Sequence, residues 1–179
     1  MAEADYCNAM GRGMEPGGQE AASDEEPEWS YESFQIPGGM ELRLRTFGFH
    51  PRNANFVWPG NAQLMEWLDT NQHLLAGKRI LELGSATGLL AIFMTMRGWQ
   101  VTTSDSEADG SLVAANIAHN FQLNSIAAAP HIQHDWGTAF PAAASPTSAF
   151  DVIVANDILI YVNTTGSSAG YPGANRGVA

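Results

Sequence analysis

The sequence predicts an α/β fold built on a parallel sheet with helices on both faces. Two short, nearly unbroken apolar runs, at residues 79–83 and 150–155, are typical of buried strands. Segments with helical periodicity alternate with strand-like segments, as in sheets whose parallel strands are joined by right-handed crossovers. A turn rich in small residues, at 84–88, follows the first apolar run directly. The chain has 179 residues, which is the length of one domain.

The acidic charge is concentrated at the N-terminus. The formal net charge is -11, and residues 1–30 hold eight acidic side chains and one basic side chain. Residues 1–28 contain almost no large apolar side chains, so we expect a disordered acidic tail there. Residues 163–179 are mostly small residues without periodicity, and they predict an unstructured tail. A partial α/β domain is therefore expected at 29–162.

Composition also argues against several kinds of partner. An acidic chain repels phosphate backbones, so we expect no nucleic-acid partner. The longest apolar stretch, Leu89 to Met96, is too short to cross a bilayer, so we expect no membrane partner. Cys7 is the single cysteine and the start resembles no secretory signal, which favours the cytoplasm, with the nucleus as a second compartment. The oligomeric state is not indicated.

The segment before the first apolar run predicts a strand and a helix. Residues 41–45 alternate polar and apolar side chains, as in a half-buried strand. Phe47, Phe49 and Phe56 are expected to help close the core. A helix capped by Asn61 is expected to run to about residue 73.

The rest of the domain predicts alternating elements. Strands are expected at 79–83, 100–104, 131–134 and 150–155, with helices at 89–97 and 111–121. Right-handed crossovers would bring the carboxyl ends of these strands to one edge of the sheet.

The turn after the first of these strands predicts a nucleotide site. It belongs to the stretch ILELGSATG, and its small residues let a ligand approach the backbone closely. The turn opens a helix whose first N–H groups are free to face a ligand. Asp105 lies 17 residues beyond Gly88, at the end of the next strand, where carboxylates bind ribose hydroxyls in nucleotide-binding sheets.

Two nucleotide ligands suit such a turn. Dinucleotides favour the spacing G-x-G-x-x-G, but those positions here are Gly84, Ala86 and Leu89, so the fingerprint fails twice. S-adenosylmethionine carries no phosphate and has an ammonium and a sulfonium. Glu82, two residues before the first glycine, would place negative charge near that cationic end. The pattern therefore favours S-adenosylmethionine as the cofactor.

ILELGSATG resembles motif I of the class I S-adenosylmethionine-dependent methyltransferases. Three further stretches narrow the resemblance to the seven-β-strand protein-lysine methyltransferases (methyltransferase family 16): residues 57–60 (VWPG), 134–136 (HDW) and 156–161 (NDILIY). The resemblance covers about residues 40–162. It implies a Rossmann-like sheet, of which this chain contains about four of the seven central strands, and a C-terminus that is truncated.

The resemblance implies a set of cofactor-binding residues. Gly84 and Gly88 would shape the loop together with Ser85, and Glu82 would lie near the methionine end. Asp105 would bind the ribose. The residues that would surround the remaining cofactor surface are Asp135 at the adenine amino group, Trp136 on the adenine ring and Trp58 beside the methionine.

The resemblance also implies catalytic residues and a protein substrate. Asp157 and Tyr161 would correspond to the family's Asp-x-x-Tyr element beside a target lysine amine. This chain has one residue too many between them, and Ala86 stands where many members have glycine. The Asn/Asp-Pro-Pro-aromatic turn of nucleobase methyltransferases is absent from residues 156–159.

Other interpretations compete with a lysine methyltransferase. A chain without the last strands would leave an exposed apolar sheet edge, so it could be a non-catalytic fragment that binds cofactor or a partner. A small-molecule methyltransferase is a further alternative, because the absent half sets much of the target pocket. His131, His134 and Asp135 lack further ligands nearby, and we expect no metal.

Overall fold

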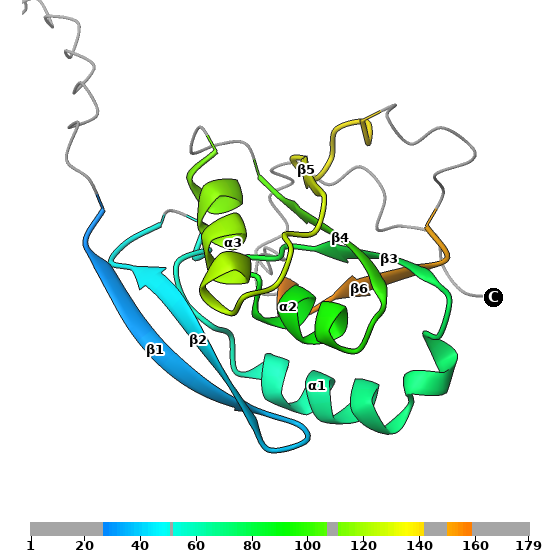
Figure 1. Cartoon of the computed structure of the whole chain (residues 1–179). Coiled ribbons are helices and arrows are strands. Elements are labelled where there is room, and N and C mark those ends of the chain that lie inside the picture. The colour runs from blue at the N-terminus through cyan, green and yellow to red at the C-terminus, as the bar shows by residue number, and fades with distance from the viewer. Residues whose placement is uncertain (1–26, 51, 107–110, 142–149, 159–179) are drawn as a thin grey trace, which may run out of the picture.

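The structure, a computed structural model, describes residues 27–50, 52–106, 111–141 and 150–158. These residues form a four-stranded parallel sheet, a separate antiparallel hairpin and three α-helices (Figure 1). The sheet has the order β5-β4-β3-β6 and contains β3 (Arg79–Leu83), β4 (Gln100–Asp105), β5 (His131–Gln133) and β6 (Val152–Ala155). The predicted partial parallel sheet is confirmed. Nearly all of both predicted tails lies outside the described residues.

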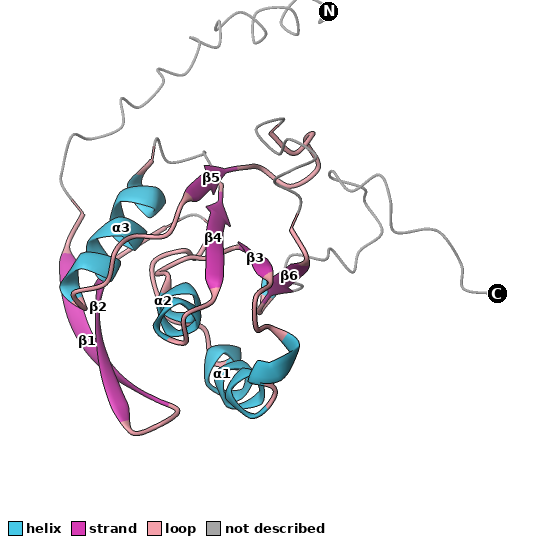
Figure 2. Cartoon of the chain, turned by 45° about the vertical axis from the view of Figure 1, so that its right-hand side comes forward, coloured by secondary structure: helices cyan, strands magenta, loops and turns pink. Residues whose placement is uncertain are grey.

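The helices α2 (Leu89–Met96) and α3 (Leu112–Leu123) lie on one face of the sheet (Figures 1 and 2). The helix α2 joins β3 to β4, and α3 joins β4 to β5, so both connections move toward the same edge of the sheet. Right-handed connections that move in the same direction place their helices on the same face of the sheet. The helix α1 (Gly60–Thr70) packs against α2 and is followed by a short 3₁₀ turn, Gln72–Leu74. In the connection between β5 and β6, the described residues 134–141 and 150–151 contain no helix.

The core forms between this sheet face and the helices. Strand register places Ile80, Val101 and Val154 on one face, and all three are buried. The helix α2 is buried almost completely at residues 89–94, because its sequence is apolar on all sides and has no solvent face to offer. This burial fixes the direction of β3 and therefore the position of the turn that follows it.

The hairpin consists of β1 (Trp29–Ile36) and β2 (Met40–Phe47), joined by a turn with positive φ at Gly38 and Gly39. The sequence predicted only part of β2. Most side chains of β1 are exposed, so β1 lacks the apolar alternation that identifies a half-buried strand.

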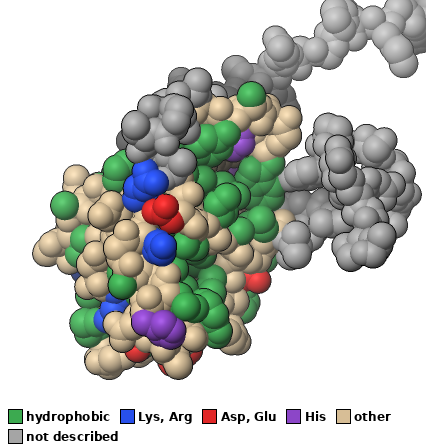
Figure 3. Space-filling model, turned by 90° about the vertical axis from the view of Figure 1, so that its right-hand side faces the viewer, with side chains coloured by type: hydrophobic (Ala, Val, Ile, Leu, Met, Phe, Trp, Pro, Cys, Tyr) green, Lys and Arg blue, Asp and Glu red, His purple; other side chains and the backbone are tan. Residues whose placement is uncertain are grey.

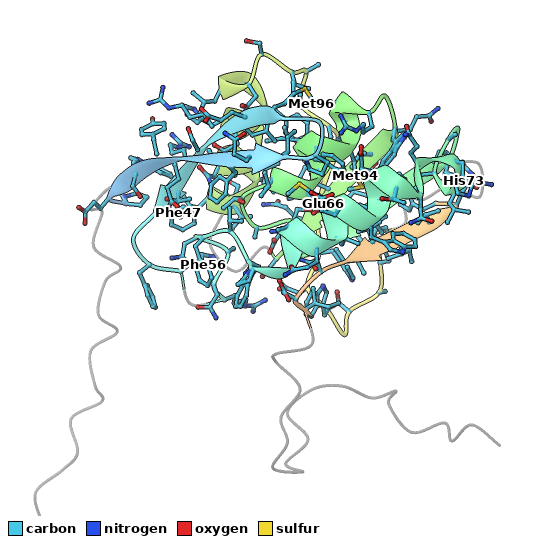
Figure 4. The ribbon with its side chains drawn as sticks, turned by 90° about the horizontal axis from the view of Figure 1, so that it is seen from below. Phe47, Phe56, Glu66, His73, Met94 and Met96 are labelled. Atoms are coloured by element: carbon cyan, nitrogen blue, oxygen red, sulfur yellow. The ribbon has the colours of Figure 1, made fainter. Side chains whose placement is uncertain are left out.

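Two of the three phenylalanines expected in the core lie elsewhere. Phe47 is buried as predicted, but Phe49 is 80% exposed and the expectation for it is wrong. Phe56 is partly exposed and packs on Trp58, with ring centroids 4.7 Å apart. Phe47 ends β2 of the hairpin, whereas Phe56 belongs to the segment between the hairpin and α1 (Figure 4). Phe56 therefore supports the wall of a cavity described below.

The beginning of α1 differs from the local prediction. The helix starts at Gly60 after Pro59, and no side chain next to it in sequence caps it. The backbone N–H of Gly60 instead donates to Oδ2 of Asp157, at 2.9 Å. Asn61 is not the cap, because its Oδ1 accepts a hydrogen bond from the Asn156 amide. The first turn of α1 is therefore completed by Asp157, two residues after the end of β6.

The strand β6 lies at one end of the sheet and pairs with β3 alone among the described strands. Ile153 on β6 is 63% exposed, and apolar side chains gather on the face of the molecule seen in Figure 3. Within the described ranges, no helix combines the length and apolar character needed to cross a membrane.

Candidate functional site

Four strand ends and one connecting segment enclose a cavity of about 330 Å³. Every strand of the sheet contributes residues from its carboxyl end, and the segment between the hairpin and α1 closes the cavity. The lining residues are Gly84 and Ala86 after β3, Asp105 and Ser106 at β4, His134 and Trp136 after β5, Asn156, Asp157 and Ile158 after β6, and Arg52, Asn53, Ala54 and Trp58 from the segment. Open α/β sheets bind their ligands at this edge.

Gly84 stands where a side chain would be crowded by its neighbours. Its φ is +69°, and a Cβ added to it would lie 3.2 Å from Cγ2 of Ile158 and 3.4 Å from Cζ2 of Trp136. The N–H groups of Gly84 and Ser85 both donate to the carbonyl of Ser104, so β4 holds the start of the loop. Trp136 and Ile158 therefore pack close to the bare backbone of Gly84, and all three residues line the cavity.

Three lining residues other than glycine have left-handed backbone conformations. Asn53, Ala86 and Asp157 have φ values of +56°, +48° and +53°. Such conformations cost about 1–3 kcal/mol each and tend to occur at functional sites. At Ala86 the positive φ gives the physical reason why glycine suits this position of the loop.

Asp105 ties the loop to β4 from within the cavity. Its Oδ2 accepts the N–H of Ala86 at 2.7 Å, and its Oδ1 accepts the N–H of Ser106 at 2.8 Å. Burial raises the pKa of Asp105, and these two backbone hydrogen bonds oppose the rise. A carboxylate has further lone pairs, so Asp105 can still accept ribose hydroxyls. The lining position agrees with the ribose role, which stays a prediction.

Asp135 does not line the cavity but joins a polar cluster at its rim. The guanidinium of Arg52 donates to Oδ1 of Asp135 and to Oγ of Ser106, at 2.5 and 2.6 Å. The Ser106 hydroxyl and then the Arg52 guanidinium hold the pKa of Asp135 below its usual range. An adenine amino group would have to share this carboxylate with Arg52.

Three other predicted cofactor residues lie beneath the loop rather than on the cavity wall. Ser85 is buried, and its Oγ accepts the N–H of Ser104. A Cβ on Gly88 would lie 3.1 Å from Ile117 of α3, so this glycine lets the helix pack against the loop. Glu82 is buried on the core face of β3, and its Oε2 has no hydrogen-bond partner in the described structure.

Burial raises the pKa of Glu82 to about 8, the nearby Asp105 adds to the rise, and the Ser85 hydroxyl opposes it. The folded protein therefore keeps a proton on Glu82 that the unfolded chain releases above about pH 4.5. By linkage, Glu82 makes the free energy of unfolding fall as pH rises from about 4.5 to about 8, by at most about 1.4 kcal/mol per pH unit.

We expect Glu82→Gln to remove this pH dependence. The variant should gain stability relative to the wild type as pH rises through that window, as measured by denaturant unfolding at several pH values. The same change at exposed Glu66 is the control for loss of a carboxyl group. A stability difference that stays constant with pH would contradict the buried, protonated state of Glu82.

Asp157 has two differently placed oxygens. Its Oδ2 accepts the N–H of Gly60 and the side-chain amide of Asn156, at 2.9 and 3.1 Å. Among the described residues, Oδ1 has no hydrogen-bond partner, and Asp157 lines the cavity. Tyr161, the predicted partner of Asp157, lies outside the described residues.

Several lining residues were missed by the sequence prediction. Ser106 and Asn156 directly follow or precede a predicted residue, so their proximity could have been inferred. Arg52 and Asn53 have no local signal, because their segment belongs to no motif and reaches the cavity only through the path of the chain from the hairpin to α1. Within the described ranges, no group of three or more His, Cys, Asp or Glu side chains could hold a metal ion.

The residues of the cavity fit S-adenosylmethionine. Carboxylates of Asp105 and Asp157 line it, so the site favours ribose hydroxyls and cationic groups over a pyrophosphate. The bare backbone of Gly84 lines the cavity close to the Trp136 ring. The fold and the site together define an S-adenosylmethionine-dependent methyltransferase domain.

Comparison with known families identifies the branch. A sequence model of the lysine methyltransferase family matches residues 41–167, and the chain belongs to this family. The family confirms S-adenosylmethionine as the cofactor and confirms the resemblance recognised in the sequence.

Individual relatives of the chain are named as protein methyltransferases. Protein N-terminal and lysine N-methyltransferase efm7 of Schizosaccharomyces pombe is 26% identical over 135 residues, which are 69% of this chain and 51% of the relative. Protein N-lysine methyltransferase METTL21A of Danio rerio is 30% identical over 112 residues, covering 63% of this chain and 50% of the relative. Histone-arginine methyltransferase METTL23 of Xenopus laevis is 30% identical over 131 residues, which cover 72% of this chain and 55% of the relative. The chain therefore spans about half the length of these relatives.

A solved structure supports the fold. The Thermus thermophilus 16S rRNA N2 G1207 methyltransferase RsmC, in complex with AdoMet and guanosine, aligns with a TM-score of 0.57 and 21% identity over 73% of this chain and 33% of that chain. At this identity the likeness concerns the Rossmann-like fold alone.

Proposed function

We propose that this chain provides the cofactor half of an enzyme that methylates a lysine side chain of a protein substrate. The observation that carries the proposal is the carboxylate of Asp157, which lines the cavity with one oxygen held and the other available. The names of relatives that act on lysine support the acceptor. A protein substrate would be met in the cytoplasm, with the nucleus as a second compartment.

The proposed roles divide between cofactor and acceptor. Bound S-adenosylmethionine would supply an activated methyl group. Trp136 and Asp105 would orient the nucleoside, and the loop at Gly84 would admit it without a side chain in the way. Trp58, supported by Phe56, would form the wall toward the acceptor. These residues contribute alignment and exclusion of water.

Asp157 would act on the acceptor amine. A lysine must lose its proton before it can attack, and burial in a cavity favours the neutral amine. Oδ1 of Asp157 would accept an amine N–H and stabilise the positive charge that the nitrogen gains during transfer. The hydrogen bonds from Gly60 and Asn156 to Oδ2 would keep the carboxylate in place.

Methyl transfer to a cell lysate tests this proposal. The purified chain is incubated with lysate and S-adenosylmethionine that carries a deuterated methyl group, and modified peptides are identified by mass spectrometry. Labelled lysine is the expected result. Label on arginine, on an N-terminal amine or on a small molecule would reassign the acceptor. Cofactor binding by calorimetry without any transfer would favour the non-catalytic fragment.

A further inference from the structure

The helix α3 presents a row of three asparagines to the hairpin. Asn116, Asn120 and Asn124 recur every four residues and therefore lie on one face of the helix. All three side chains form hydrogen bonds with arginines of β2. The outer edge of β2, which no described strand pairs, is thus satisfied by side-chain amides from α3.

Two of these asparagines bind β2 in the same way. Oδ1 of Asn120 accepts the backbone N–H of Arg45 at 2.7 Å, and its Nδ2 donates to the Arg45 carbonyl at 3.0 Å. Oδ1 of Asn124 accepts the backbone N–H of Arg43 at 3.0 Å, and its Nδ2 donates to the Arg43 carbonyl at 2.8 Å. Each side-chain amide thus makes the two hydrogen bonds that one residue of a neighbouring strand would make with β2.

Asn120 makes one contact that Asn124 does not make. Its Nδ2 also donates to the carbonyl of Thr87, at 2.9 Å, and Thr87 lies within the loop at 84–88. Asn120 is completely buried, and Thr87 is buried as well. One amide group therefore connects the hairpin, the helix and the cofactor loop.

We propose that Asn120 is a positioning residue that couples the hairpin to cofactor binding. Thr87 stands between Ala86, which lines the cavity with φ +48°, and Gly88, which packs on Ile117 of α3. A left-handed alanine persists only where its surroundings hold it. Asp105 holds the N–H of Ala86, and Asn120 holds the next carbonyl along the chain.

The inference rests on the proposed use of the loop for S-adenosylmethionine, and paired variants test it. Asn120→Asp keeps the acceptor for the Arg45 N–H but places an oxygen against the carbonyls of Arg45 and Thr87. Asn124→Asp makes the same change toward the carbonyls of Arg43 and Asn120 and contacts no residue of the loop. Calorimetry with S-adenosylhomocysteine should show binding about tenfold weaker in Asn120→Asp than in Asn124→Asp.

Kinetics separate positioning from general stability. In Asn120→Asp the KM for S-adenosylmethionine should rise by the same factor, while kcat at saturating cofactor stays within about twofold of that of Asn124→Asp. Thermal unfolding of both variants shows whether either has lost its fold. Equal cofactor affinities in two folded variants would overturn the inference.

Hydrogen exchange in the wild type gives a test that does not depend on a variant folding. If the hairpin and the loop are coupled, cofactor binding must stabilise the hairpin in return. Saturating S-adenosylhomocysteine should slow exchange of the Arg45 amide and leave the Arg43 amide unchanged. Equal protection of the two amides would overturn the coupling. A wild type that does not bind the ligand would instead count against the proposed function.

Discussion

Asp157→Asn is expected to reduce methyl transfer by about a hundredfold or more, while S-adenosylmethionine binds as in the wild type. The asparagine oxygen can still accept the N–H of Gly60 and so complete the first turn of α1. Its amide nitrogen would then occupy the place of Oδ1, where a donor cannot accept the N–H of the target amine. Asparagine also tolerates the positive φ of this position. Turnover and calorimetric binding, measured on the same preparation, check both parts.

Asp157→Ala distinguishes the role of this carboxylate as the cap of α1 from its proposed role at the acceptor amine. It should lose methyl transfer to the same extent and should also unfold at a lower temperature, because α1 loses its cap, at a cost of about 1 kcal/mol. If Asp157→Asn remained active while Asp157→Ala only lost stability, Asp157 would be a helix cap and not a catalytic residue. Thermal unfolding of both variants beside the activity assay distinguishes these outcomes.

Gly84→Arg is expected to abolish cofactor binding. A Cβ at this position already meets Ile158 and Trp136, so a long side chain would displace these cavity-lining residues or enter the cavity itself. The positive φ of +69° adds strain of about 1–2 kcal/mol for any residue with a Cβ. Calorimetry with S-adenosylhomocysteine should detect no binding.

Gly77→Arg is the matched control for Gly84→Arg. Gly77 has φ +71°, nearly the same backbone conformation, but an added Cβ meets no atom within 4 Å. This variant should show similar backbone strain and normal cofactor affinity. Comparable loss of binding in both variants would mean that strain, and not occupation of the cavity, weakens the site.

Local patterns predicted most of the central sheet correctly. The run at 79–83, the helix at 89–97 and the strand beginning at residue 100 each carry their own apolar periodicity and end at a glycine or an acidic residue. The predicted Asn61 cap of α1 was wrong and β1 was not predicted, and both errors have the same origin. The cap of α1 comes from Asp157, and β1 is held by its pairing with β2, so neither element is determined by its own sequence.

The candidate site was predicted where it consists of strand ends. Asp105 ends its strand, and Gly84, Trp136 and Asp157 follow the other three. Parallel strands bring their carboxyl ends to one edge whatever the details of packing. Arg52 was missed because it reaches Asp135 across a separation of 83 residues. Glu82 was placed near the ligand by motif, but the register of β3 directs it into the core beneath the loop.

The sequence by itself determined the order of the strands along the chain, the glycine turn, and the acidic residues that follow the strands. These features depend on neighbours a few residues apart, whose periodicity and backbone freedom can be recognised locally. Only the tertiary structure decided which oxygens remain available, which carboxyl group is buried and protonated, and which side chains hold the loop. Those properties depend on contacts between residues 19 to 97 positions apart, such as Ala86 with Asp105 and Gly60 with Asp157, and a one-dimensional pattern does not record them.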